Sequence, residues 1–201
     1  MKTEIPVKEK KKMKYICPRE QKFMKEISTI RKAEKADIKR IWQIILQAKE
    51  QMRRMNSRQW QDGYPAVETI AADIESGYGS VLCVGKEVIA YAAVIFEGEP
   101  SYNDIKGKWL TDQPYMVVHR LAVADEMKNR GVATFFMQQI EELSRQKGIH
   151  SFRVDTNFDN LYMQKIFSAL DFTYCGEIFY DKNPRRAYEK DLSVSNKVPK
   201  Y

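Results

Sequence analysis

The chain has 201 residues, of which 43% are hydrophobic and 30% charged, and its formal net charge is +7. This composition supports one packed domain and argues against wholesale disorder. The longest apolar stretch, 88–96, has nine residues, less than half of the roughly 20 that a membrane-spanning helix needs. The first residues contain no apolar segment of the kind found in secretory signals. We therefore expect a soluble, cytoplasmic protein that has no membrane partner.

The positive charge is concentrated at the N-terminus. Residues 1–27 contain nine Lys/Arg and four Asp/Glu, which accounts for +5 of the total and leaves +2 for residues 28–201. A short lysine run of this kind is typical of a solvated arm, and a specific nucleic-acid partner is not expected. We predict a flexible basic extension over 1–27, a single domain over 28–191 and a C-terminal tail over 192–201.

Cysteine and histidine are too sparse for a metal centre. Cys17, Cys83 and Cys175 are widely spaced, and an odd number of cysteines argues against a disulfide framework. The chain has two histidines, His119 and His150. We therefore predict buried free thiols in a reducing compartment and no metal site.

Hydrophobic periodicity and turn residues predict eleven helices and strands. In chain order these are strand 28–33, helix 36–52, helix 67–76, strands 80–84, 88–96 and 115–123, helix 130–147, strand 151–155, helix 159–170, and strands 172–180 and 185–191. The order β-α-α-β-β-β-α-β-α-β-β indicates an α/β domain with a mixed central sheet flanked by helices. Residues 97–114 form a long polar loop, and loops of that length in a compact domain are often functional.

One segment has the pattern of an anion-binding site. The apolar strand 117–123 leads through a short polar loop into a helix that starts with small residues near Gly131 and Ala133. The first amides of a helix have no intrahelical acceptor, and the helix dipole makes that end electropositive. Gly131 and Ala133 let an anion approach this backbone, and Lys128 and Arg130 add positive charge. The pattern predicts a phosphate or pyrophosphate site.

This segment resembles the signature of the GCN5-related N-acetyltransferase (GNAT) family. That signature is a strand followed by Gln or Arg, two residues, Gly, one residue, and Gly or Ala at a helix start. The equivalent here is Lys128-Asn129-Arg130-Gly131-Val132-Ala133, with Lys in the first place. The family also has an Asn after its next strand and an aromatic-x-x-Leu-Gly-Phe run, which correspond to Asn160 and to Phe167-Ser168-Ala169-Leu170-Asp171-Phe172. The resemblance covers about residues 28–191.

The resemblance implies that acetyl-coenzyme A is the cofactor. Its pyrophosphate is expected on the amides of Asn129, Arg130, Gly131, Val132, Ala133 and Thr134, with Lys128 beside them. Its pantetheine arm is expected to pair with the backbone of Leu121 and Val123, where strands 115–123 and 151–155 splay apart, and to bond Asn160. The implied reaction is direct acetyl transfer to a primary amine in a ternary complex.

The chain departs from the family pattern at two positions. The family often has a tyrosine where Phe167 stands, and a phenyl ring cannot protonate the departing thiolate. That role falls to Tyr162, to Ser168 or to water. Asp171 replaces the glycine at a helix end, where aspartate tolerates the left-handed conformation better than most residues do.

Amine acetylation requires loss of the ammonium proton, so a general base is needed. His119 is the best candidate, because its ordinary pKa near 6.5 suits proton transfer at neutral pH. Strand alternation predicts that it shares a face with Val117, Leu121 and Val123; a hydrogen-bonded core histidine is the alternative. Asp155 is a second possible base or a turn anchor, and Glu97 and Glu99 either attract a cationic amine or are simply solvated.

Trp60 and Tyr64 precede the second helix, in the region that flanks the acceptor site in this family, so they are predicted to shape that site or to pack the two helices together. The acceptor is predicted to be an amine on a small molecule or a peptide, and a homodimer is a possible assembly. Two other functions compete with the transferase: a non-catalytic acyl-CoA sensor, and a basic nucleic-acid- or ribosome-binding protein that uses the lysine-rich extension.

Overall fold

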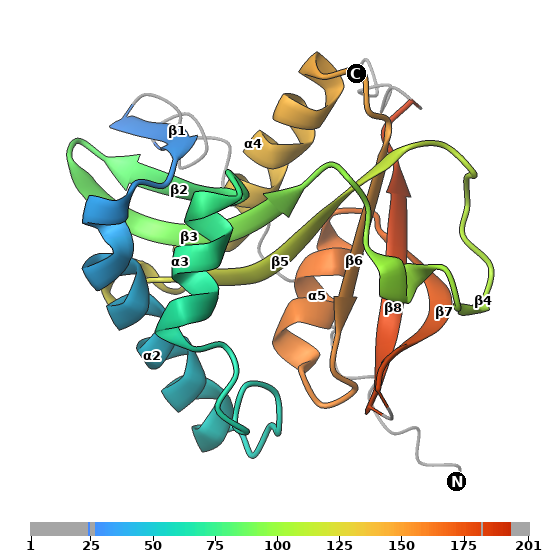
Figure 1. Ribbon diagram of the computed structural model, residues 1–201, viewed down its shortest axis with the longest axis horizontal. Coiled ribbons are helices and arrows are strands. Elements are labelled where there is room, and N and C mark those ends of the chain that lie inside the picture. The colour runs from blue at the N-terminus through green and yellow to red at the C-terminus, as the bar shows by residue number, and fades with distance from the viewer. Residues whose placement is uncertain (1–23, 25–26, 182, 194–201) are drawn as a thin grey trace, which may run out of the picture.

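The computed structural model describes residue 24, residues 27–181 and residues 183–193 (Figure 1). Within these residues the order of the eleven predicted elements is confirmed, and one short strand, β4, is added. The strands are β1 (Ser28–Lys32), β2 (Gly79–Val84), β3 (Glu87–Ile95), β4 (Lys106–Gly107), β5 (Tyr115–Val123), β6 (Ser151–Thr156), β7 (Thr173–Tyr180) and β8 (Asn183–Asp191). The α-helices are α2 (Ile38–Arg54), α3 (Val67–Glu75), α4 (Val132–Gln146) and α5 (Leu161–Ala169).

The eight strands form one mixed sheet, which confirms the predicted α/β fold class. The strand order is β1-β2-β3-β5-β6-β8-β7-β4. Every neighbouring pair is antiparallel except β5 and β6, which run parallel. Short turns join β2 to β3, at Gly85, and β7 to β8, whereas the parallel pair β5 and β6 needs the crossover helix α4.

Helices cover both faces of the sheet (Figure 1). Helix α2 turns the buried side chains of Ile41, Ile44 and Ile45 toward β2 and β3, in one hydrophobic cluster with Ile70 of α3. Helices α4 and α5 pack against the opposite face, where Phe136 is fully buried with side chains of β3, β5 and β6. In α2 and in α4 the apolar positions recur at three- and four-residue steps. This spacing gives each helix one apolar face, which packs against the sheet.

The predicted polar loop over 97–114 is ordered against the part of the sheet that α2 and α3 leave uncovered. Tyr102 of this loop is 1% exposed and lies in a cluster with Val117, Ile178 and Ala187. The fully buried carboxylate of Glu189 in β8 holds the loop, accepting a hydrogen bond from Thr111 Oγ1 at 2.7 Å. A buried carboxylate needs such donors, so the loop and the sheet stabilise each other.

The hydrophobic core reaches slightly beyond the predicted domain limits. Met24 and Leu192 are 5% and 3% exposed and belong to the same cluster as α4. Most of the predicted extension over 1–27 and most of the predicted tail over 192–201 lie outside the described residues, and so does Cys17. Cys83 and Cys175 are free and buried as predicted, and burial raises the pKa of the Cys175 thiol to about 11. No helix of the described part is long and apolar enough to cross a membrane.

The sheet divides between its two parallel strands. Strand β5 pairs with β6 only from Tyr115 to Val117, opposite residues 151–153. Beyond Val117 the two strands diverge, and β5 continues along β3 while β6 continues along β8. The edge of β5 that faces β6 is therefore free of a partner strand over the rest of its length, as the sequence predicted.

Candidate active site

A β-bulge lies in β5 beside the divergence. Ala93 pairs with His119 and Tyr91 pairs with Ala122, so two steps along β3 face three steps along β5. Arg120 absorbs the extra residue with a left-handed φ of +57°. A bulge reverses the inward and outward alternation that follows it.

The bulge overturns one prediction about His119. His119 shares a face with Val117, on the side of the ordered loop, but Leu121 and Val123 pack into the cluster around α4 on the other side. Strict alternation had placed all four on one face. Because of the extra residue, β5 presents an imidazole to one side of the gap and aliphatic side chains to the other.

The bulge is held by a buried ion pair. Arg120 donates to both carboxylate oxygens of Asp73 in α3, from Nε at 2.7 Å and from the terminal nitrogen Nη2 at 2.6 Å. Tyr91 donates to the same carboxylate at 2.6 Å, and Arg120 donates to the hydroxyl of Tyr64 at 2.5 Å. The Arg120 and Asp73 side chains are 10% and 7% exposed. Bidentate geometry makes this pair rigid, so the backbone at residue 120 is well defined.

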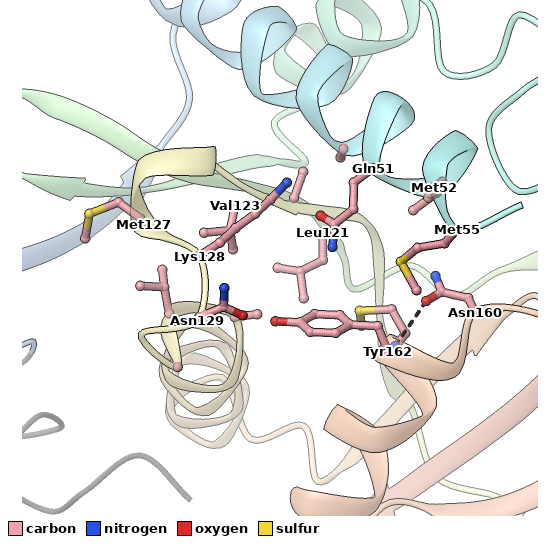
Figure 2. Close-up of a pocket in the computed structure, with 16 residues that line it drawn as sticks. Gln51, Met52, Met55, Leu121, Val123, Met127, Lys128, Asn129, Asn160 and Tyr162 are labelled. Carbon is pink, nitrogen blue, oxygen red and sulfur yellow. Dashed lines mark hydrogen bonds between the residues drawn. The ribbon is translucent and has the colours of Figure 1, made fainter. Parts of the chain in front are cut away.

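A first pocket opens between α2, β5, the start of α4 and α5, and includes about 680 Å³ of empty space, part of it continuous with solvent. Figure 2 shows Leu121 and Val123 pointing into it from β5, opposite Gln51 and Met52 of α2. Most of its lining side chains are apolar. The lining residues that had been predicted to contact the cofactor are Leu121, Val123, Lys128, Asn129, Gly131, Val132, Ala133 and Asn160.

A row of free amides borders this pocket. Asn129 and Gly131 both have left-handed φ values, +60° and +71°, and Gly131 is the N-cap of α4. The amides of residues 129–134 donate to no backbone or side-chain acceptor among the described residues. Left-handed residues in a loop before a helix turn successive N–H groups to one side, which is the geometry of an anion nest.

Three of the predicted cofactor contacts are less direct. Lys128 lines the pocket, but its ammonium group forms an ion pair with Asp125. Arg130 and Thr134 are not among the lining residues. The backbone therefore supplies most of the polarity here.

Asn160 is used mainly by the fold itself. It is the N-cap of α5, with its side-chain oxygen accepting from the Met163 amide at 3.1 Å, the dashed line in Figure 2. Its nitrogen donates to Gln59 at 2.8 Å. Each amide atom retains one further hydrogen-bonding direction. Asn160 thus joins α5 to the loop after α2 at the inner end of the first pocket.

Tyr162 lines only the first pocket. Its ring extends from α5 across the pocket, and its hydroxyl points toward Asn129 at the start of α4 (Figure 2). Burial raises its pKa, so the phenol stays protonated at neutral pH. This orientation puts the hydroxyl on the side of the free amides.

A second pocket, with about 530 Å³ of empty space that includes open solvent, continues the first through the divided sheet. Met52, Leu121, Asn160 and Met163 line both pockets. The second pocket differs from the first in its ionisable side chains, namely His119, Arg120, Asp155 and Arg185. A ligand that extends through the gap in the sheet would therefore reach from the free amides of the first pocket to the ionisable side chains of the second pocket, which we call the chamber.

His119 lies between two carboxylates. Its Nε2 is 3.0 Å from Oε2 of Glu99, and its Nδ1 is 3.7 Å from Oδ1 of Asp155. The hydrogen bond with His119 is the largest cause of a lowered Glu99 pKa. Asp155 also accepts from the buried hydroxyl of Tyr102 at 2.8 Å. Glu99 is therefore engaged with the imidazole, which rules out the simple solvated loop position considered for it.

Trp60 and Tyr64 both line the second pocket, so the loop between α2 and α3 forms one of its walls. Asp159 holds this loop, accepting from Ser57 Oγ and from the Arg58 amide, each at 2.9 Å. Trp60 is 7% exposed and also packs in the cluster under α2, whereas Tyr64 is 43% exposed. Trp60 thus lines the second pocket and also packs against α2, and its role in shaping an acceptor site stays a prediction.

Phe167 is 2% exposed and forms part of the chamber floor with Val118, Met137 and Val154. Its ring packs against Phe172 and Tyr188, with centroids 5.5 and 5.2 Å away. The floor is apolar where a tyrosine hydroxyl would otherwise stand. Asp171, at the end of α5, has the left-handed φ of +62° expected for it. No group of three His, Cys, Asp or Glu residues in the described ranges is arranged to hold a metal ion.

Comparisons with known proteins agree with this architecture. The model of the acetyltransferase (GNAT) family matches residues 37–172. A crystal structure of a GNAT-family acetyltransferase from Streptococcus agalactiae is 36% identical, with a TM-score of 0.74 over 82% of this chain and 95% of that chain. A GNAT-family acetyltransferase from Listeria monocytogenes is 17% identical, with a TM-score of 0.67 over 82% of this chain and 95% of that chain. No curated protein matches the chain.

The yncA protein from Salmonella typhimurium, solved with its cofactor acetyl-CoA, is 16% identical, with a TM-score of 0.58 over 87% of this chain and 98% of that chain. At that identity the likeness concerns the fold alone. The divided mixed sheet and the helix start beside its gap are the architecture of an acetyltransferase domain. The chain belongs to the GNAT family of acetyltransferases.

Proposed function

We propose that this protein is an acetyl-CoA-dependent N-acetyltransferase that transfers the acetyl group directly to a primary amine in a ternary complex. The observation that carries the proposal is the continuity of the two pockets. Four residues line both, so the pocket bordered by free amides adjoins the pocket that holds an imidazole between two carboxylates. No cysteine or serine stands beside a base in the chamber lining, so direct transfer is favoured over a covalent intermediate.

The residues of the first pocket fit coenzyme A. Its pyrophosphate is an anion, and the amides of residues 129–134 are free to donate to one. Gly131 leaves room at the left-handed position, and its lack of a side chain lets an anion approach the helix start. The free edge of β5 at Leu121 and Val123 suits an extended amide-containing arm, which pairs as an added strand does.

In the reaction that we propose, acetyl-CoA supplies an activated thioester: a C–N bond forms, the C–S bond breaks, and the thiol leaves with a proton. His119 accepts the proton of the incoming ammonium, directly or through one water. Glu99 and Asp155 orient the imidazole and stabilise its protonated form. The amine enters past Trp60 and Tyr64.

The proton donor to the thiolate is less sharply defined. Phe167 supplies no hydroxyl, and Tyr162 turns its hydroxyl toward Asn129. Tyr162 and water at the junction of the pockets are the two candidate sources, and this orientation of the hydroxyl favours water.

The first experiment measures acetyl-CoA binding by calorimetry. Gly131→Glu adds a side chain at a left-handed position and a carboxylate among the free amides, so we expect at least about 100-fold weaker binding. The matched control is Gly148→Glu at the other end of α4, which has a φ of +72° and nothing within 4 Å of an added Cβ. That control carries the same backbone strain and should bind acetyl-CoA as the wild type does.

Turnover is then measured as thiol release from acetyl-CoA with a panel of primary amines. Binding that is lost in Gly131→Glu, together with amine-dependent thiol release, supports the transferase. Tight binding without turnover of any amine would instead support the acyl-CoA sensor. If neither the wild type nor the Gly148→Glu control binds acetyl-CoA, the proposal is wrong.

A further inference from the structure

Two arginines line the second pocket, and each lies beside a carboxylate, but they are held very differently. Arg120 has both oxygens of Asp73 at 2.6 and 2.7 Å and is 10% exposed. Arg185 of β8 has a single contact with Asp155, from the terminal nitrogen Nη1 to Oδ2 at 3.4 Å, and is 20% exposed. A guanidinium has five N–H donors, so Arg185 keeps most of its hydrogen-bonding capacity while Arg120 uses its own.

The Nε atom of Arg185 gives an independent indication. It is buried and has no hydrogen-bond partner among the described residues. The guanidinium is supported by the ring of Tyr180, 5.0 Å away, which holds it without satisfying any N–H. Native proteins rarely leave a buried charged donor unpaired. The Nε atoms of Arg153 and Arg186 are also buried and without a hydrogen-bond partner among the described residues, but neither of those side chains lines either pocket, whereas Arg185 lines the second.

Asp155 has hydrogen-bond donors besides Arg185, which is the partner of its Oδ2. Its Oδ1 accepts from Tyr102 at 2.8 Å and from Tyr180 at 3.4 Å, and its side chain is 3% exposed. The same carboxylate lies within 4 Å of both His119 and Arg185. His119, the candidate base, and Arg185, the available cation, therefore lie on either side of one carboxylate group. One small molecule can reach both.

We propose that Arg185 binds a carboxylate on the acceptor, so that the acceptor is a small amine bearing a carboxylate, such as a free amino acid, with its ammonium directed at His119 and Glu99. This inference rests on the proposed function and names the acceptor class of the same site. In the second pocket, Arg185 lies beside Asp155 on one side, and His119 with its partner Glu99 lies on the other. A zwitterion matches this arrangement, with its carboxylate at Arg185 and its ammonium at His119 and Glu99. Bidentate recognition of a carboxylate is the contact that a guanidinium favours most.

The test compares amines that differ only in the carboxylate. Each pair consists of an amino acid and its decarboxylated counterpart: phenylalanine with 2-phenylethylamine, and leucine with isopentylamine. The readout is kcat/KM for thiol release from acetyl-CoA. We expect the wild type to favour the carboxylated member by about 10-fold or more, since a charge-assisted bond of this kind gives about 10- to 100-fold.

Arg185→Gln should abolish this preference while leaving acetyl-CoA binding unchanged, and Arg185→Lys should restore part of it. The matched control is Arg186→Gln on the next residue of β8, whose guanidinium stacks on Phe158 and Tyr174 and does not line the pocket. Comparing the ratio within each pair across variants removes the difference in amine pKa. A ratio in Arg185→Gln equal to that of the wild type overturns the inference, as does a wild-type preference for the amines without a carboxylate.

A binding measurement separates this inference from the proposed function. N-acetyl-phenylalanine and N-acetyl-2-phenylethylamine are titrated into the protein with and without coenzyme A. Tighter binding of the carboxylated compound that is lost in Arg185→Gln and kept in Arg186→Gln supports the subsite even where turnover fails. Equal binding of the two compounds, or binding of neither, overturns it. The proposed function is judged separately, by acetyl-CoA binding to the wild type and to Gly131→Glu.

Discussion

The two pockets that meet at the divided sheet differ in the groups that supply their polar contacts. The first is lined by aliphatic and methionine side chains, and its polar groups are mainly backbone amides at the start of α4. The second has an apolar floor, and its polar groups are mainly ionisable side chains from β5, β6 and β8, supported by Asp73 and Glu99 from outside it. The first needs a particular backbone shape, whereas the second needs particular side chains.

This difference indicates which of the two pockets can change its ligand specificity by substitution. A pocket whose polar contacts come from the backbone tolerates most side-chain substitutions, provided that the left-handed positions are kept. A pocket built from charged side chains changes its ligand preference with a single substitution. We therefore expect mutations in the second pocket to alter acceptor use and stability while leaving acetyl-CoA binding intact.

The strongest way to break the second pocket is to remove the partner of Arg120. Asp73→Ala leaves a buried guanidinium without its counter-charge, and we expect it to lower the free energy of unfolding by about 3–5 kcal/mol. The matched control is Asp37→Ala, which breaks the bidentate pair with Arg31, a side chain that is 38% exposed. Because Asp37 also accepts from the Glu34 amide, we expect about 1–2 kcal/mol there.

Denaturant unfolding of the two variants measures this comparison. Equal losses would mean that the burial of the Arg120 pair contributes nothing to the stability of the bulge.

The next comparison concerns the two histidines. His119→Gln removes the proposed base, and we expect kcat to fall about 100- to 10,000-fold with no change in the acetyl-CoA dissociation constant. His150→Gln is the control, because His150 lines neither pocket. Steady-state thiol release and calorimetry give the two quantities. A parallel loss of acetyl-CoA binding in His119→Gln would show that the two pockets are not separable.

A smaller, pH-dependent effect is expected at Glu99. Its folded-state pKa is lowered, chiefly by the hydrogen bond with His119, so its charged form stabilises the fold. That contribution is fully present above the unfolded-state pKa of about 4.3 and is lost as the pH falls through the lower folded-state value. The wild type should therefore melt at a higher temperature than Glu99→Gln at pH 5, and this difference should decline as the pH falls below about 4.3.

Glu97→Gln serves as the control for this pH series, since its carboxylate bonds the neighbouring Phe96 amide and not His119. Thermal unfolding is followed for the three proteins between pH 3 and 7. A wild-type advantage over Glu99→Gln that does not decline between pH 5 and 3 would contradict the pairing of Glu99 with His119.

The smallest effect is expected at Tyr162, on the side of the first pocket. Because its hydroxyl points toward Asn129 (Figure 2), we expect Tyr162→Phe to change kcat by less than about threefold and to act mainly on the KM for acetyl-CoA. Loss of a true proton donor costs about 100-fold or more. Steady-state kinetics with acetyl-CoA varied distinguishes the two, and a 100-fold fall in kcat would establish Tyr162 as the donor to the thiolate.

Much of the first pocket was predictable from local sequence. The strand before Lys128, the polar loop and the small residues at Gly131 and Ala133 are neighbours in the chain, and short-range rules describe how such neighbours fold. The left-handed positions at Gly77, Gly148 and Asp171 also follow from local turn chemistry. The order of all eleven elements was predicted for the same reason, since periodicity and turn residues are local signals.

The second pocket was only partly predictable. His119, Trp60 and Tyr64 were expected near the acceptor, but Arg185 and the Arg120–Asp73 pair were not. The pairing of Glu99 with His119 joins a loop to a strand 20 positions away in the chain. Asp159 accepts a hydrogen bond from Ser57, which is 102 positions away in the chain. No local pattern reports contacts between such distant segments.

The secondary structure, the sheet class and the small-residue start of α4 could therefore be predicted from the amino-acid sequence, because each depends on residues close together in the chain. The tertiary structure was needed to determine which side chains of β5 point to each side of the sheet. Strict alternation put His119 with Leu121 and Val123, and one extra residue at Arg120, stabilised by Asp73 from a helix 47 positions earlier, reversed it. A bulge depends on such a distant contact, and that contact forms only when the chain has folded.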